Sequence, residues 1–165
     1  MIAAAFHTAD AVMIGVVFVL ILLSALIAVA ETAITRISRS RAASLAEQGL
    51  KRADLVVGIV GNYERNLNAV YFVALACQTV QAAITGIVAS RLFGTWGVVI
   101  ATTINVLIVF ILAEAAPKTW ALQHTDRAAL GTAPLVLMCG RLFRWVADGL
   151  IVVTNVILPG KGLEQ

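Results

Sequence analysis

The sequence predicts an all-α membrane protein with three transmembrane helices plus juxtamembrane or interfacial amphipathic helices, in a single domain over residues 1–165. Hydrophobic residues make up 61% of the chain and charged residues only 13%, whereas soluble proteins average about 25% charged residues. The apolar residues also gather into runs long enough for a helix to cross a hydrocarbon core of ~30 Å. A soluble enzyme of this size could not cover its surface with so few charges, so that class is excluded.

Three uncharged runs each predict a membrane-spanning helix. The first is 11–30, which predicts a span at about 10–32. The second is 66–90, and the third is 95–113, which predicts a span at about 95–117. Only residues 91–94 separate the second run from the third, so we expect a tight turn between two antiparallel neighbouring helices.

The remaining helices are predicted at the membrane surface. Residues 40–62 predict one or two short helices, broken at Gly49 and near Gly61. A fourth apolar stretch, 133–158, carries charged or polar side chains on one helical face at Arg141, Arg144, Asp148 and Asn155. Charges are rare at mid-depth in a spanning helix, so an interfacial amphipathic helix fits better. The alternative is a fourth span whose charges face the interior of a helix bundle.

The distribution of Lys and Arg predicts the orientation. Residues 1–10 contain no Lys or Arg, the segment 31–65 contains six, and the tail after the third run contains five. We therefore expect the N-terminus outside and the C-terminus in the cytoplasm, in a multi-pass protein of the plasma (inner) membrane of a prokaryote. The missing N-terminal positive charge also argues against a signal peptide.

Polar residues inside the first two spans are costly in lipid and therefore indicate function or helix packing. Ser24 and Glu31 are seven residues apart and share a face, although a lone Ser24 hydroxyl could bond to its own helix. The second span has two polar stripes: Gln78, Gln81 and Thr85, then Thr79, Gly86 and Ser90, with Asn66 and Asn68 at its cytoplasmic entrance. One stripe can be explained by interhelical hydrogen bonds, whereas two adjacent stripes suggest a hydrated cavity or an ion path.

The third span ends in the sequence Ala113-Glu114-Ala115-Ala116-Pro117-Lys118. Pro117 has no N–H and removes the bond to the Ala113 carbonyl. A freed carbonyl beside the Glu114 carboxylate is a good cation site, as in the broken helices of transporters. The alternative is a simple kink in which Glu114 and Lys118 form an i,i+4 ion pair. Thr103 lies eleven residues before Glu114, on the same face.

The candidate ligands are all oxygen atoms, which select hard cations such as Mg²⁺, Ca²⁺ or Na⁺. His, Cys and Met clusters, which would hold soft metals, are missing from the sequence. Cys77 and Cys139 lie in apolar runs, where they are expected to be small buried hydrophobic residues. These observations predict a hard-cation pathway and do not choose the ion.

Three stretches of the sequence form a set. The first is Ser24-Ala25 leading to Ala30-Glu31-Thr32-Ala33 and a basic, serine-containing run at 36–41, the second is Leu75-Ala76-Cys77-Gln78-Thr79, and the third is the 113–118 sequence. Together they resemble the membrane domain of the CorC/CNNM family, implicated in magnesium transport, and the third is similar to the family's "GEIxPK". The resemblance covers about residues 10–160. Two positions depart from the pattern: Ala113 replaces a glycine, and Cys77 or Gln78 replaces an Asn or Gly. The second-helix ligand could therefore be Gln78, Asn68 or Ser90.

The resemblance implies three spans, a juxtamembrane helical belt, a homodimer and cytoplasmic CBS domains that follow residue 165. It implies Mg²⁺ bound near mid-membrane by Ser24, the Ala113 carbonyl and Glu114, with Glu31 and Lys118 near the cytoplasmic mouth. The expected function is Mg²⁺ transport, as export by alternating access, with a Na⁺ gradient as a plausible driving force.

The expected partners are a second copy of the chain, membrane lipids and Mg²⁺, without nucleic acid. The alternative function is a membrane-embedded dimeric scaffold or regulator without transport. An intramembrane enzyme is disfavoured, because Glu31 and Glu114 are the one carboxylate pair available and no Ser/His pairing or HExxH motif is present.

Overall fold

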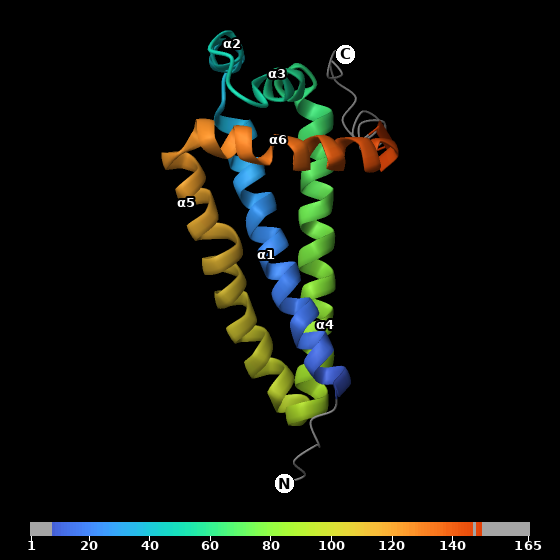
Figure 1. Cartoon of the computed structure of the whole chain (residues 1–165). Helices are drawn as coiled ribbons and strands as arrows, with labels where there is room; N and C mark the ends of the chain where they lie inside the picture. The colour runs from blue at the N-terminus through green and yellow to red at the C-terminus, as the bar shows by residue number, and fades with distance from the viewer. Residues whose placement is uncertain (1–7, 147, 150–165) are drawn as a thin grey trace, which may run out of the picture. The chain divides into compact units, whose positions relative to one another are not determined.

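The computed structural model describes residues 8–146 and 148–149, and every element in that part of the chain is a helix (Figure 1). The order is α1 (Thr8–Arg36), α2 (Arg39–Glu47), α3 (Ala53–Gly61), α4 (Tyr63–Val109), the π-helix η1 (Phe110–Ala115), α5 (Ala116–Gln123) and α6 (Thr125–Leu142). The all-helical class predicted from composition is therefore confirmed for the described residues.

Within residues 8–146 and 148–149, two helical stretches are long and apolar enough to cross a membrane. They are Thr8–Arg36, with 29 residues, and Tyr63–Gln123, with 61 residues. Only 17% and 11% of their most apolar segments are buried within the chain. A core helix of a soluble protein would be mostly buried, so these apolar surfaces are suited to a lipid environment.

Gly94 divides the second stretch into two arms. Its φ of 68° and ψ of −163° are non-helical, and a positive φ is readily adopted by glycine because it has no Cβ. The helical segments before and after Gly94 run in opposite directions (Figure 1). A Cβ at Gly97 would lie 2.0 Å from the Cβ of Phe93, so this turn also needs its second glycine. The tight turn expected at 91–94 is therefore present.

The chain forms two compact units. The first contains Met1–Val29 and Ala74–Gln123, and its described part is the N-terminal portion of α1 with the hairpin centred on Gly94. The second contains Ala30–Val73 and His124–Gln165, and in it α3 packs against both α2 and α6. The core of the second unit includes fully buried Leu45, Val56 and Val136.

Helices α2 and α3 occupy the region predicted as juxtamembrane. The Ser38 hydroxyl accepts a hydrogen bond from the Arg41 N–H at 3.1 Å and so caps the N-terminus of α2. Gly49, with φ of 68°, follows α2. The expected break at Gly49 is present, and α3 ends at Gly61, close to the second expected break.

Helix α6 begins at Thr125, eight residues before the start expected from the apolar run at 133. The N-terminal turns are helical because Ala128, Ala129 and Thr132 provide a small buried face, and Asp126 favours the positive end of the helix dipole. α6 is not one of the helices long and apolar enough to span a membrane. The part of the 133–158 prediction at 147 and 150–158, including Asn155, lies outside the described residues.

Candidate functional site

Glu114 lies at an irregular point in the second arm of the hairpin. The π-helix Phe110–Ala115 carries it, and the Ala116 N–H bonds to the Ile111 carbonyl, five residues back. Pro117 follows directly, where it cannot donate to the Ala113 carbonyl. The helix is therefore interrupted where the sequence predicted a break. π-helical turns inside α-helices often occur at functional sites.

Two donors meet at the Glu114 carboxylate. Gln78 Nε2, from the first arm, donates to Glu114 Oε1 at 2.5 Å. Lys118 Nζ lies 2.7 Å from Glu114 Oε2, one helical turn further on. The carboxylate therefore joins the two arms and also forms the i,i+4 pair that the alternative interpretation expected.

This arrangement can receive a cation if one donor gives way. The Glu114 and Lys118 side chains are 27% and 35% exposed, so both can be reached from outside the chain. A divalent cation would replace the Lys118 ammonium, and the Gln78 amide could turn its carbonyl oxygen toward that cation. In the described part of the chain no three His, Cys, Asp or Glu side chains gather into a metal-binding group. An ion bound here would therefore keep several waters, as Mg²⁺ commonly does.

A second polar contact joins the same two arms. Gln81 is buried, and its Nε2 donates to Asn105 Oδ1 at 2.6 Å and to Thr85 Oγ1 at 3.1 Å. The Thr85 hydroxyl in turn donates to the Gln81 carbonyl at 2.9 Å. These groups satisfy one another, which favours interhelical hydrogen bonding as the role of this part of the stripe.

The second predicted stripe does not join this cluster. Thr79 and Ser90 are exposed and Gly86 is half-buried. The Thr79 hydroxyl donates to the Leu75 carbonyl of its own helix at 2.7 Å. Thr103 is likewise exposed and donates to the Val99 carbonyl at 2.9 Å.

The other predicted site residues are divided between the two units. Ser24 and Ala113 are both buried in the first unit. Glu31 and Asn68 are half-buried and belong to the second unit. Of the predicted site residues, the structure thus brings Gln78, Glu114 and Lys118 into direct contact.

An ion pair at the turn end of the first unit was not anticipated. Asp10 is only 3% exposed, and its Oδ1 lies 3.7 Å from Arg91 Nη1. The sequence held a signal for it, because Asp10 and Arg91 are charges at the edges of two apolar runs that the predicted topology brings to the same side of the membrane.

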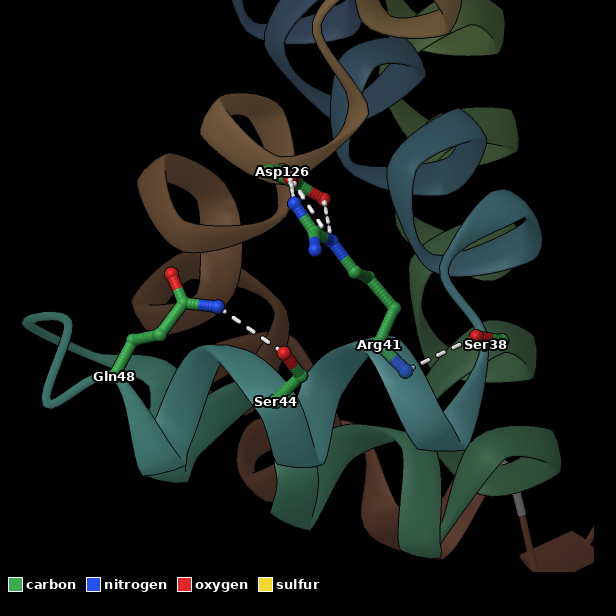
Figure 2. A network of polar contacts seen from close by, with 5 residues as sticks. All are labelled: Ser38, Arg41, Ser44, Gln48 and Asp126. Atoms are coloured by element: carbon green, nitrogen blue, oxygen red, sulfur yellow. Dashed lines mark hydrogen bonds and ion pairs between the residues drawn. The ribbon is translucent and has the colours of Figure 1, made fainter.

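The second unit has its own polar network (Figure 2). Arg41 Nη2 donates to Asp126 Oδ2 at 2.6 Å, and Arg41 Nε donates to the same oxygen at 3.2 Å. The Asp126 carboxylate raises the pKa of the Arg41 guanidinium through this hydrogen bonding and charge attraction. Asp148 pairs with both Arg65 and Arg144, at 3.0 and 3.8 Å. These contacts bind α2 to α6 and the start of α4 to the segment after α6.

The chain matches one family of known proteins over most of its length. Residues 15–165 match the family described as the Cyclin M (CNNM) transmembrane N-terminal domain. The chain belongs to the CNNM family. This membership, together with the two long apolar helices, makes the chain a membrane protein domain.

Curated relatives of this CNNM domain share moderate identity with it. The UPF0053 inner membrane protein YfjD of Escherichia coli K12 is 25% identical in an alignment of 150 residues that covers 84% of this chain and 35% of the relative. A UPF0053 protein of Mycobacterium tuberculosis is 26% identical over 148 residues, or 89% of this chain and 34% of the relative. One from Haemophilus influenzae is 23% identical over 159 residues, or 94% and 38%.

The chain spans about a third of the length of these curated relatives. Neither the family description nor the names of these relatives describe an enzyme. The CorC/CNNM resemblance read from the 24–41, 75–79 and 113–118 stretches is therefore confirmed at the level of the family.

Proposed function

We propose that this domain transports Mg²⁺ across a membrane, with Glu114 as its principal anionic ligand. The observation that carries the proposal is the Gln78–Glu114–Lys118 cluster at the π-helical break before Pro117. A carboxylate beside an interrupted helix offers both a charge and a carbonyl oxygen to a hard cation. Membership of the CNNM family supports this choice of ion, since the family is implicated in magnesium transport.

In the proposed mechanism, Lys118 neutralises Glu114 when the site holds no Mg²⁺, and Mg²⁺ displaces the ammonium group. Ser24, the Ala113 carbonyl and the Gln78 amide then supply further oxygens. Movement at the Pro117 break opens the other side, which gives export by alternating access. In this mechanism a Na⁺ gradient is the driving force, and Na⁺ would compete for the same oxygen ligands.

The proposed topology has three spans. The two arms around Gly94 are each long enough to cross a bilayer, and α1 supplies the third span. The excess of Lys and Arg between α1 and α4 supports a cytoplasmic location for that segment and an N-terminus outside. The inner membrane is the expected location, since the relative YfjD is named as an inner membrane protein.

We further propose that the active form is a homodimer. Thr79, Gly86 and Ser90 form a stripe of small residues along the first arm, and Thr79 and Ser90 are exposed in the single chain. Small residues allow close approach of two helices in a membrane. The stripe is therefore assigned to helix packing between two copies, and not to direct ligation of the ion.

A membrane-embedded dimeric scaffold is the second candidate. The observation that favours it is that Gln81, Thr85 and Asn105 already satisfy one another, as Glu114 and Lys118 do. A scaffold needs such polar contacts only to hold its helices together. It therefore predicts neither cation binding nor flux.

The two candidates are separated by the thermal stability of the purified chain titrated with Mg²⁺, Ca²⁺, Mn²⁺ and Na⁺. A cation that binds the folded state stabilises it by roughly 2.7 kcal/mol at 100 times its Kd. Transport predicts a Mg²⁺-dependent rise in melting temperature that Glu114→Gln loses and Ser24→Ala weakens. Glu47→Gln removes an exposed carboxylate from α2 and serves as the matched control.

Flux completes the test. The same variants reconstituted into liposomes should differ in the rate of Mg²⁺ transport. The unmodified chain and Glu47→Gln should be fastest, Ser24→Ala slower and Glu114→Gln slowest. If no ion raises the melting temperature and the unmodified chain moves no Mg²⁺, the scaffold function replaces transport. If Mg²⁺ binds and is transported but Glu114→Gln binds and transports it equally well, transport stands and the site assignment is wrong.

A further inference from the structure

An open apolar groove lies on the second unit, away from the residues assigned to transport. Helices α3 and α6 form it, and it encloses about 730 Å³. This volume is within the range of about 300–1,000 Å³ found for small-molecule sites. The lining residues are Leu55, Pro134, Leu137, Met138, Arg141 and Leu142. The groove therefore combines an almost wholly hydrocarbon wall with a single cationic group.

Arg141 differs in its ion pairing from Arg41, Arg65 and Arg144 of the same unit. Asp126 pairs with Arg41, and Asp148 pairs with Arg65 and Arg144. Among the described residues, no carboxylate lies within ion-pair distance of Arg141. Its guanidinium group, with five donors in a planar fork, is therefore available for an anion from outside the chain, and phosphate suits that geometry.

The surroundings of the groove have the composition of a membrane interface. Met138, Leu142 and Trp145 are 58%, 63% and 74% exposed. Trp is enriched where a membrane meets water, and Arg can extend its head group to the polar region while its stem lies against hydrocarbon. In an established membrane domain, such a surface meets phospholipid.

We propose that this groove binds one anionic phospholipid, with an acyl chain along Leu55, Leu137 and Leu142 and the phosphate on Arg141. The hydrocarbon wall selects the acyl chain, and the Arg141 guanidinium selects a negatively charged head group. Such a site would anchor the α3–α6 pair to a negatively charged phospholipid. The proposal depends on membrane location and not on Mg²⁺ transport, so the two can fail separately.

The test is native mass spectrometry of the full chain released from detergent and titrated with phosphatidylglycerol or phosphatidylcholine of equal chain length. We expect phosphatidylglycerol to bind more tightly and Arg141→Gln to weaken it about fivefold, the scale of one basic residue acting on an anionic membrane lipid. Arg127→Gln is the matched control, because Arg127 is an exposed arginine of the same helix that does not line the groove. Met138→Ser tests the hydrocarbon wall at an exposed position.

Each outcome bears on the proposal. Loss of selectivity in Arg141→Gln alone, with binding that tightens as the acyl chain lengthens and weakens in Met138→Ser, supports it. Equal weakening by Arg127→Gln would show diffuse surface charge and overturn it. It would also be overturned if inorganic phosphate displaced the lipid completely, or if Met138→Ser changed the proportion of dimer while lipid binding stayed constant.

Discussion

Gln78 and Glu114 are 36 residues apart in sequence and share a hydrogen bond between the two arms of one helical hairpin. The bond fixes the Glu114 carboxylate from one side, and Lys118 holds its other oxygen. Because both carboxylate oxygens are occupied by donors, cation binding at this point is a competition. This makes Lys118 an expected regulator of affinity, and it makes Gln78 a positioning residue whose amide can also become a ligand.

We predict that Lys118→Met increases the Mg²⁺-dependent stabilisation of the purified chain. Removing the ammonium leaves the partly buried Glu114 carboxylate without its ion pair, which lowers stability without Mg²⁺ and raises apparent affinity. The measurement is the melting temperature at increasing Mg²⁺, with Lys51→Met, an exposed position between α2 and α3, as control. An unchanged or weaker Mg²⁺ response would show that Lys118 does not compete with the ion.

The Gln81–Asn105 contact should stabilise the hairpin without affecting the ion. Hydrogen bonds between membrane helices contribute about 0.6 kcal/mol on average and up to about 1.7 kcal/mol. We expect Gln81→Leu and Asn105→Leu each to lower the melting temperature, and the double variant to lose less than the sum of the two. The Mg²⁺ response should persist in all three. Additive losses would indicate that the two side chains do not interact.

The helices and their turn could be predicted from the sequence, because they depend on local properties. Apolar runs of about twenty residues and a glycine at position 94 predict two antiparallel arms without knowledge of any tertiary contact. It also identified Glu114 and Pro117, since charge and a missing N–H are costly in a membrane whatever their surroundings.

Side-chain contacts between different helices were harder to predict from the sequence. Helical periodicity placed Gln78, Gln81 and Thr85 on one stripe, and the structure gives two of them different partners, Glu114 and Asn105. Periodicity equally placed Thr79 and Ser90 on a stripe that is exposed. Which of two neighbouring faces meets the next helix depends on how that helix packs, and no local pattern encodes it.

Gly140 is predicted to be intolerant of any side chain. A Cβ there would lie 2.5 Å from Asn66 Oδ1, and the Asn66 amide cannot easily withdraw because its Nδ2 donates to the Ile59 and Asn62 carbonyls. Overpacking of this kind typically costs about 1–3 kcal/mol. Gly140→Ala should therefore lower the melting temperature by several degrees, since about 1 kcal/mol corresponds to roughly 2–4 °C at this size.

Gly131→Ala is the matched control in the same helix, because nothing lies within 4 Å of a Cβ at that position. It should be neutral or slightly stabilising, since alanine favours helix over glycine by about 1 kcal/mol. Combining Gly140→Ala with Asn66→Ala should cost less than the two changes added together, because the clash disappears with the amide. Equal effects of Gly131→Ala and Gly140→Ala would show that the close approach is not present in solution.

The cap of α2 is expected to control the local stability of the juxtamembrane segment. Ser38 accepts the Arg41 N–H, and the same Arg41 holds Asp126 of α6 through its guanidinium (Figure 2). Ser38→Ala removes the cap, a change that costs about 0.5–2 kcal/mol, whereas Asp is as good a cap as Ser. Hydrogen exchange of the first-turn amides of α2 should accelerate in Ser38→Ala and stay slow in Ser38→Asp. Because fraying of that turn also loosens Arg41, exchange at the start of α6 should rise in parallel, and a rise confined to α2 would show that the Arg41–Asp126 pair does not transmit the cap's effect.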